Sequence, residues 1–178
     1  MLTIGHSTLS LEAFLRALQD NGVETLVDVR RFPGSRRHPH FGQAALFRSL
    51  EGIGIEAIWR EGLGGRRKAQ RDSKNTGWKN ESFRGYADYM QTPEFQAELD
   101  WLTGLPEIAN TVVMCAEAVP WRCHRSLIAD AVMARGLQVE DVLVKPDGES
   151  TRKPHRLTPF AQVSDGRVWY PKEPVLFV

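Results

Sequence analysis

Residues 1–30 read MLTIGHSTLSLEAFLRALQDNGVETLVDVR, and this stretch decides the fold class. After the apolar start at Leu2–Ile4, Ser10 can cap a helix. The apolar positions of this helix follow the i, i+3, i+4, i+7 rule: Leu11, Phe14, Leu15 and Leu18. Asn21-Gly22 ends the helix, because glycine supplies a left-handed closing residue. Residues 24–30 are β-rich, so the stretch predicts a β-α-β unit with a parallel pair of strands and a right-handed crossover.

The alternation of strands and helices continues along the chain. Residues 111–115 are a nearly continuous apolar run, which is typical of a central strand covered on both faces. Thr92-Pro93 places a cap and a first-turn proline at the start of a helix. Further helices are expected at 44–51, 83–90 and 120–135, and further strands at 55–59 and 139–144. The sequence thus predicts an α/β fold, a three-layer open sheet that is mostly parallel and has helices on both faces.

The length of 178 residues fits one domain, and we expect a single α/β domain over 1–178. Residues 60–82 have no apolar periodicity and are expected to form a basic loop insertion, a kind of segment that is usually functional or mobile. Residues 146–178 are a proline-rich C-terminal extension, in which the Asp165-Gly166 turn predicts a terminal hairpin or lid.

The composition is that of a globular protein, with 42% hydrophobic and 25% charged residues. No apolar run approaches the ~20 residues that a membrane span needs. The start MLTIGHS lacks the features of a signal peptide. We therefore expect a soluble, cytoplasmic protein without membrane contact. In that reducing compartment Cys115 and Cys123 should be thiols or metal ligands rather than a disulfide.

Charge is unevenly distributed along the chain. The net charge is +1, but residues 30–84 carry 13 Lys and Arg against 5 Asp and Glu. A basic block in an otherwise acidic chain predicts an anionic partner, either a small molecule or a nucleic acid. The alternative is a solvated surface laced with salt bridges.

Polar residues follow three of the expected strands. In parallel sheets ligands bind beyond the carboxyl ends of the strands, so these residues are expected to share one cleft. In chain order they are His6 and Ser7, then Asp28, Arg30, Ser35 and Arg36, and finally Cys115, Glu117, Cys123, His124 and Arg125. We expect His6, Arg30 and Cys115 in particular to lie around that cleft.

Asp28 and Arg30 stand two apart on a strand, so their side chains point to the same face. One interpretation is an ion pair that ties off a buried strand end. The other is direct involvement of Arg30 in the site, because a charge is rarely buried without a partner or a purpose. Arg36 lies in a Pro/Gly loop from which its guanidinium could bind a carboxylate or phosphate. His38 and His40 are expected to be solvated.

Either cysteine is a candidate nucleophile. Cys115 ends a strand, and Cys123 is expected in the first turn of the following helix, where the helix dipole lowers a thiol pKa. An anion is expected between Arg30, Arg36 and this helix start. His124 and Arg125 would donate hydrogen bonds or shuttle a proton, and Glu117 could orient one of them. The alternative is that both cysteines are small core residues.

A zinc site built from Cys115, Cys123, His124 and His6 is a further alternative. The C-x7-C-H spacing matches no common zinc module, and adjacent Cys and His rarely point at one ion. We therefore predict no metal, and no motif predicts a cofactor.

Several motifs together resemble one family, the bacterial and archaeal domain of unknown function 488. They are TIGHS, LVDVRRFPGSR, GLGG, FRGYADYM, VVMCAEAVPWRCHRSLIADAV and PHRLTPFA. The resemblance spans essentially the whole chain and implies a three-layer α/β domain without naming an activity. The functional residues that it implies are His6, Ser7, Asp28, Arg30, Pro33, Ser35, Arg36, Gly64, Gly65, Cys115, Glu117, Cys123, His124 and Arg125.

LVDVR and the strand that ends in Cys115 also look like the rhodanese-type sulfurtransferases. The loop after Cys115 departs from that pattern, because it contains Pro120 and Trp121 in place of small residues. Such a loop cannot easily point successive N–H groups at one sulfur, which argues against persulfide chemistry.

Two functions from different classes remain. The first is an enzyme that acts on an anionic substrate, phosphorylated, nucleotide-like or nucleic acid, in the Arg/His/Cys cleft. The second is a non-catalytic nucleic-acid-binding module that uses the basic region 30–84. In that module Trp59, Trp78, Phe83 and Tyr86 would stack on bases. We favour the enzyme, because polar groups at three strand ends exceed what simple binding needs.

Overall fold

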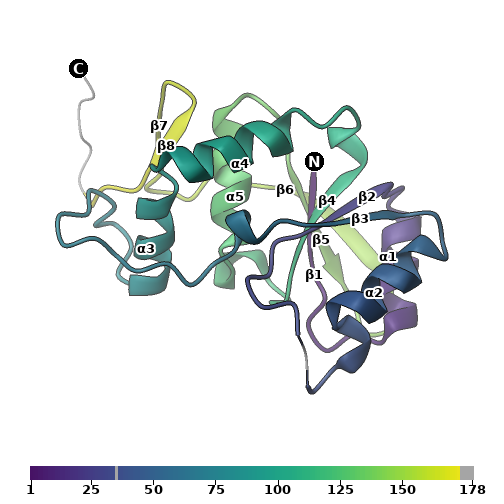
Figure 1. The fold of residues 1–178 in the computed structure, drawn as a ribbon. Coiled ribbons are helices and arrows are strands. Elements are labelled where there is room, and N and C mark those ends of the chain that lie inside the picture. Colours follow the sequence, from purple (N-terminus) through teal and green to yellow (C-terminus); the bar gives the residue numbers. More distant parts are fainter. Residues whose placement is uncertain (35, 173–178) are drawn as a thin grey trace.

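One six-stranded sheet forms the centre of the computed structural model, which describes residues 1–34 and 36–172. The strands are β1 (Leu2–Gly5), β2 (Thr25–Asp28), β3 (Glu56–Trp59), β4 (Thr111–Cys115), β5 (Glu140–Val144) and β6 (Ser150–Pro154). Their order is β3-β2-β4-β1-β5-β6 (Figure 1). Strands β1 to β5 all run parallel to one another, and only β6, at the edge beside β5, runs antiparallel within this sheet. The mostly parallel sheet is confirmed.

The first two strands are parallel but do not pair with each other. β4 lies between them, with Leu2 opposite Val112 and Thr25 opposite Thr111. The expectation of a parallel pair within the first thirty residues was therefore wrong. The sequence pattern fixes the direction of a strand, whereas the buried run of β4 takes the central position between β1 and β2.

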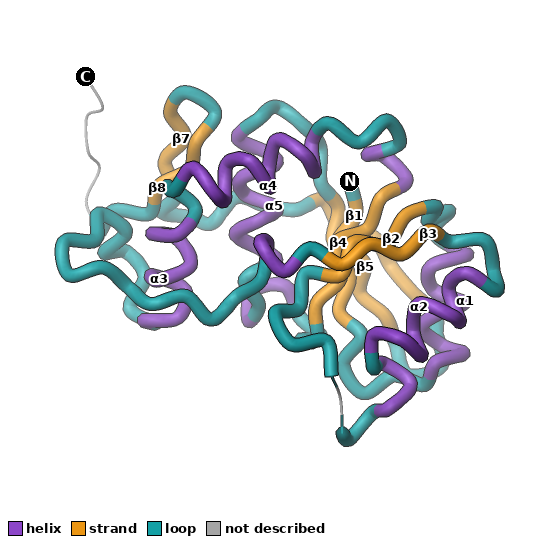
Figure 2. Tube along the Cα trace, viewed as in Figure 1, coloured by secondary structure: helices purple, strands orange, loops and turns teal. Residues whose placement is uncertain are grey.

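The described residues form five α-helices (Figures 1 and 2). Helices α1 (Leu11–Asp20) and α2 (Gln43–Glu51) lie on one side of the sheet and pack there through residues such as Phe14 and Leu46. Helices α4 (Pro93–Thr103) and α5 (Arg125–Ala134) lie on the other side, with α3 (Glu81–Tyr89) beyond α5, and these three helices belong to the core on that side. The predicted caps are confirmed: Ser10 Oγ accepts from the Ala13 N–H, and Thr92 Oγ1 accepts from the Phe95 N–H. The fold is the expected three-layer α/β arrangement.

Helix α5 is shorter than expected, with consequences for Cys123. A 3-10 helix at Pro120–Arg122 comes first, and α5 begins only at Arg125. Cys123 has an extended backbone (φ −132°, ψ 142°) between the two, so its placement in the first α-helical turn was wrong. It still lies at the helix start, because the Arg125 N–H donates to Cys123 Sγ at 3.5 Å.

Residues 60–82 contain a 3-10 helix at Glu61–Leu63 and are then irregular up to the start of α3 at Glu81. A polar anchor, the buried carboxylate of Asp88 on α3, holds the middle of the segment. It accepts from the Gln70 N–H (2.8 Å), Ser73 Oγ (2.6 Å) and Asn75 Nδ2 (2.9 Å). An apolar pattern was therefore not needed to fix this loop in place.

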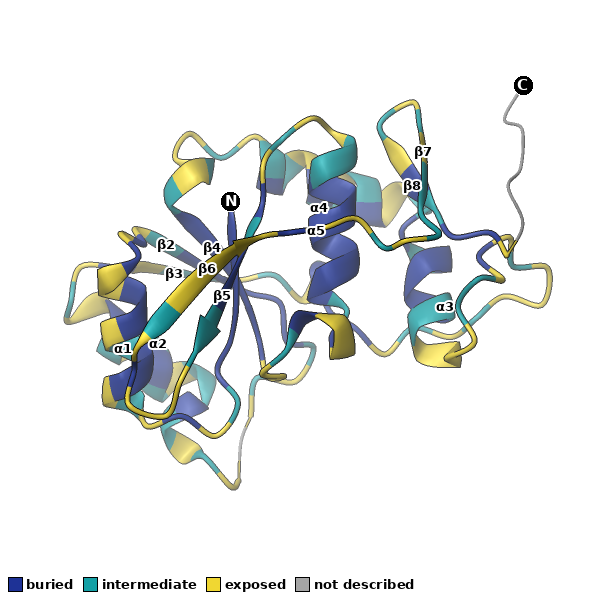
Figure 3. Cartoon of the chain, turned by 180° about the vertical axis from the view of Figure 1, so that it is seen from behind, coloured by how far each residue is buried: buried dark blue, intermediate teal, exposed yellow. Residues whose placement is uncertain are grey.

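The C-terminal extension contains the predicted hairpin, β7 (Gln162–Ser164) and β8 (Arg167–Trp169). Val168 and Tyr170 are buried, and the Tyr170 hydroxyl donates to Asp130 on α5 at 2.8 Å. The hairpin is thus packed against the core. The extension also contributes β6, which the sequence analysis missed, because STRKP is an exposed edge strand without apolar alternation (Figure 3).

Within the described residues, no helix combines the length and the apolar character needed to cross a membrane.

Candidate functional site

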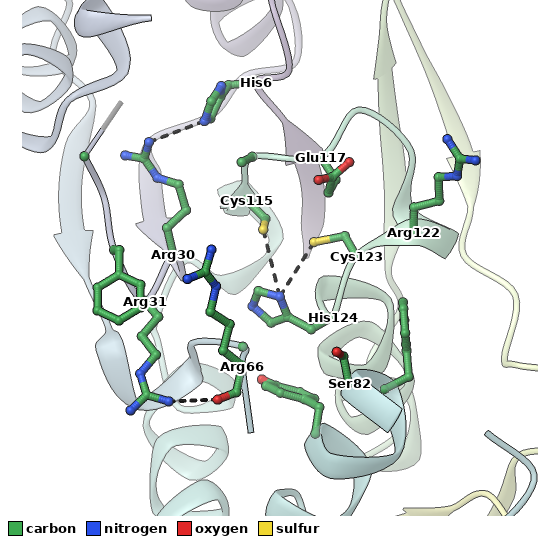
Figure 4. Close-up of a pocket in the computed structure, with 16 residues that line it drawn as sticks. His6, Arg30, Arg31, Arg66, Ser82, Cys115, Glu117, Arg122, Cys123 and His124 are labelled. Carbon is green, nitrogen blue, oxygen red and sulfur yellow. Dashed lines mark hydrogen bonds between the residues drawn. The ribbon is translucent and has the colours of Figure 1, made fainter. Parts of the chain in front are cut away.

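A cleft of about 330 Å³ lies at the carboxyl ends of β1, β2 and β4 (Figure 4). Sheet register brings these ends together, because Gly5 pairs with Cys115 and Asp28 with Met114. The loops after the three strands contribute His6, Arg30 and Cys115 to its lining, as expected. Gly65-Arg66 and α3 residues form the opposite wall.

A cluster of two thiols and one imidazole forms part of the cleft lining. His124 Nδ1 lies 3.9 Å from Cys115 Sγ and 3.8 Å from Cys123 Sγ. The Cys123 thiol donates to Cys115 and, together with His124, holds the pKa of Cys115 well below its usual range, although burial opposes this. The same contact with Cys115, and burial, raise the pKa of Cys123. Of the two thiols, Cys115 is therefore the one whose thiolate the cluster favours.

Arg30 is held by a two-pronged ion pair with Asp28. Its Nε and Nη2 donate to the two carboxylate oxygens at 2.9 and 2.6 Å, and Nη1 donates to the Phe41 carbonyl at 2.7 Å. Asp28 is fully buried and does not line the cleft, whereas Arg30 does. The ion pair is thus confirmed, with Asp28 positioning the guanidinium at the edge of the cleft. The involvement of Arg30 in function stays a prediction.

His6 is a neutral base next to this guanidinium. Its Nδ1 donates to the Ser7 carbonyl (3.0 Å), which leaves Nε2 to accept from Arg30 Nη1 (3.3 Å). Burial, and then the charge of Arg30, lower the pKa of His6 to about 4. The ring, stacked on Phe41 at 4.1 Å, is therefore uncharged near neutral pH. Ser7 is not among the lining residues, and its N–H donates to the Ala116 carbonyl.

Arg125 has a different role from the one expected. It is fully buried, and its Nη1 and Nη2 donate to the carbonyls of Glu117 and Ala118. It therefore positions the loop after β4 and does not face a ligand. Glu117 is tied to Arg125 through its carbonyl, while its exposed side chain lines the cleft. Gly5, which the sequence analysis missed, makes this possible, because a Cβ there would collide with the Glu117 carbonyl.

The GLGG motif allows a close approach of two chain segments. A Cβ at Gly65 would lie 2.9 Å from His124 Nδ1, so only glycine lets this wall lie against the imidazole. Gly64 is buried outside the lining, and a Cβ there would lie 3.0 Å from Arg31 Cβ. The two glycines therefore shape the cleft.

Arg36 is a further predicted residue that does not line the cleft. It is exposed, and its place outside the lining removes it from the expected anion site. Ser35 lies outside the described residues. His40, expected to be solvated, lies against Phe41 and contacts the Leu9 carbonyl at 3.0 Å through Nε2.

Sequence analysis missed several lining residues, among them Arg31, Phe32, Arg66 and Arg122. Arg31 Nη1 donates to the Arg66 carbonyl at 3.0 Å. The guanidinium carbons of Arg31 and Arg66 lie 5.9 and 5.4 Å from the centre of the Phe32 ring. The signal for two of them was the basic block, which pointed to the segment but not to individual side chains.

Cys115, Cys123 and His124 could also hold a soft metal ion. Their donor atoms lie within 4.8 Å of one another, the one such group among the described residues. A tetrahedral zinc ion, with Zn–S near 2.3 Å and Zn–N near 2.0 Å, would hold S and N about 3.5 Å apart. The observed distances of 3.8 and 3.9 Å need only a small closure. His6 is not part of this group.

Comparison with curated proteins and with solved structures finds no match. Residues 10–132 match a family model described as a domain of unknown function, DUF488, in agreement with the resemblance of the motifs. This match covers more than half of the 178 residues and includes most of the cleft. The chain therefore belongs to the DUF488 family.

Proposed function

We propose that the protein is an enzyme that uses the Cys115 thiolate as a nucleophile toward an anionic, phosphorylated or nucleotide-like substrate. The observation that carries the proposal is the contact of His124 with both sulfurs in a cleft that also presents cationic side chains. Free cysteine is ordinarily protonated at neutral pH, whereas a neighbouring thiol donor and imidazole favour the reactive thiolate.

The cationic side chains support an anionic substrate. Arg31, Arg66 and Arg122 line the cleft, and the last two are exposed. The charge of Arg30 is largely balanced by Asp28. The role of Arg30 is therefore to shape the cleft and to offer a partial positive charge to a ligand there. Guanidinium groups bind carboxylates and phosphates with two parallel hydrogen bonds, which suits this arrangement.

A nucleophilic displacement accounts for the remaining groups. Cys115 sulfur forms a bond to the electrophilic atom of the substrate while the bond to the leaving group breaks, and the leaving group takes a proton from water. A second water molecule then cleaves the sulfur–substrate bond and restores the thiolate. Its proton goes to Glu117, which is exposed in the same cleft. Glu117 then gives this proton to the hydroxide that the first water molecule left, which restores the carboxylate.

The non-catalytic alternative depended on four aromatic residues that do not form one surface. Trp59 Nε1 donates to the Arg30 carbonyl, and Trp78 and Phe83 stack on each other with ring centres 4.7 Å apart. Tyr86 is fully buried and donates to the Leu63 carbonyl at 2.7 Å. The positions of Tyr86 and of the Trp78–Phe83 pair favour core packing over base stacking, whereas Trp59 is 38% exposed.

Alkylation with iodoacetamide, followed by peptide mass spectrometry, tests the proposal. Cys115 should react near neutral pH with a midpoint below the ordinary thiol value of about 8.5, and inorganic phosphate should slow the reaction. Cys123→Ala should raise the midpoint, because it removes the donor to Cys115 and leaves the nucleophile in place. If both cysteines of the unaltered protein react as slowly as buried thiols, the nucleophile role is withdrawn and the binding module becomes the better explanation.

A further inference from the structure

A second, basic groove of about 550 Å³ adjoins the Cys115 cleft. Residues 67–76 and the start of α3 line it, and Ser82 lines both the groove and the cleft. Arg66 of the cleft is followed directly by Arg67 of the groove. The two hollows therefore form one continuous surface. The cleft alone, at about 330 Å³, is at the small end of ligand sites, so it accommodates only a small unit of a larger ligand.

The groove is cationic, with four basic side chains and one carboxylate, Glu81. Arg67 has a structural role, because it donates to the carbonyls of the 62–64 turn and lies over the Tyr89 ring at 3.7 Å. Lys68 and Arg71 are exposed. Arg84 is partly exposed, and its contact with Glu81 is a loose 3.5 Å ion pair. Three cations are thus available to an anionic ligand.

Hydrogen bonds within the protein fix one wall of the groove. The hydrogen bonds of the Gln70 N–H, Ser73 and Asn75 to the buried Asp88 carboxylate hold its wall to α3. The entropic cost of ordering this wall therefore belongs to folding, and a ligand that binds the groove does not have to order the wall again. A preformed cationic groove fits a ligand with charges repeated along its length.

Phe32 supplies a flat apolar surface at the cleft. Its side chain is 63% exposed and has the guanidinium groups of Arg31 and Arg66 beside its ring. An exposed aromatic ring flanked by guanidinium planes is a platform for stacking a base, which polyphosphates and acidic peptides cannot use.

We infer that the substrate is a single strand of nucleic acid, with one nucleotide in the Cys115 cleft against Phe32 and its neighbouring phosphates along the groove. The inference rests on the proposed function, because it takes the cleft as the reactive end of the site. The phosphodiester strand is common to RNA and DNA, and the experiment includes both.

Fluorescence anisotropy with labelled RNA and DNA strands of roughly 12 nucleotides tests the inference. The triple variant Lys68→Ser, Arg71→Ser, Arg84→Ser should weaken binding and lower the slope of log affinity against log salt by up to about 2, or about 0.7 for each lost contact. Phe32→Ala should weaken binding by roughly 5- to 100-fold, the loss of one stacked base. The matched control Arg16→Ser, Arg48→Ser, Lys153→Ser removes the same charge elsewhere and should bind like the unaltered protein.

Three results would overturn the inference. They are unaltered affinity of the groove variant, an equal loss in the control, and displacement of the strand by inorganic polyphosphate as readily as by unlabelled nucleic acid. Failure of the proposed function is seen separately, in the rate of Cys115 alkylation without nucleic acid. The strand should also protect Cys115 from alkylation, and the groove variant should lose this protection while keeping the unprotected rate.

Discussion

Replacement of His155 by glutamine should remove a pH-dependent part of the protein's stability. His155 lies between two carboxylates, with Nδ1 2.8 Å from Asp141 Oδ2 and Nε2 3.1 Å from Asp130 Oδ1. Burial alone would lower the pKa of His155, but the hydrogen bonds to Asp130 and Asp141 outweigh it and raise the pKa to about 9. The buried ring is therefore an imidazolium in the folded protein up to about pH 9, whereas in the unfolded chain it loses its proton near pH 6.5.

The pKa of His155 in the folded protein lies above its unfolded value of about 6.5. The contribution of charged His155 to the free energy of unfolding is therefore complete below pH ~6.5 and is lost as the pH rises toward about 9. At about 1.4 kcal/mol for each pH unit, this separation corresponds to about 3 kcal/mol of unfolding free energy. His155→Gln leaves two buried carboxylates without their cation and should lower the free energy of unfolding by about 3–5 kcal/mol near pH 6. Near pH 9.5 the cost should shrink by about 3 kcal/mol.

Urea unfolding at about pH 6 and about pH 9.5 measures both quantities in each protein. The difference between the unaltered protein and the variant isolates His155, because all other titrating groups are common to both. A difference in stability that is the same at the two pH values would refute the reasoning, since it would mean that His155 is uncharged in the folded state.

Three other variants or additions probe the site and its support. Asp88→Ala should cost roughly 1–3 kcal/mol in urea unfolding, since it leaves the donors of the 70–75 segment unpaired, and should make that segment sensitive to limited proteolysis. Gly65→Ala should slow Cys115 alkylation at unchanged secondary structure by circular dichroism, because the new methyl group displaces the His124 ring; an unaltered rate would contradict the contact. Zinc ions should block Cys115 alkylation and a chelator should restore it, whereas alkylation unaffected by zinc would show that the Cys/His cluster does not close around an ion.

The cleft was predictable because its main parts follow apolar runs. Each strand that ends at the cleft is a short buried segment with polar residues directly after it, and parallel strands share their carboxyl edge. That reasoning places His6, Arg30 and Cys115 together without knowledge of the strand order. It does not predict whether a residue interacts through its side chain or its backbone. Arg125, for example, donates to the backbone carbonyl of Glu117 and not to its carboxylate.

The parts that could not be predicted are held by polar groups distant in sequence. Asn75 accepts from the Tyr170 N–H across 95 positions, and Thr3 donates to Asp141 across 138 positions. Neither contact leaves a periodic trace in the sequence, because hydrophobic periodicity reports only which face of a local element is buried. The anchoring of the basic loop was missed for this reason, whereas the strand β6 was missed because it is an exposed edge strand without apolar alternation.

The strand order also determines when the sheet can form during protein synthesis. β1 leaves the ribosome first, yet its neighbours β4 and β5 start more than a hundred residues later, with Leu2 opposite Val112 and Glu140. At a typical synthesis rate of about 5–20 residues per second, β1 waits roughly 5–20 seconds for β4. During that time its apolar side chains and free backbone groups are exposed to solvent and to other chains. The central position of β1 thus delays its pairing until β4 has been synthesised and gives the nascent chain a period in which a chaperone can bind it.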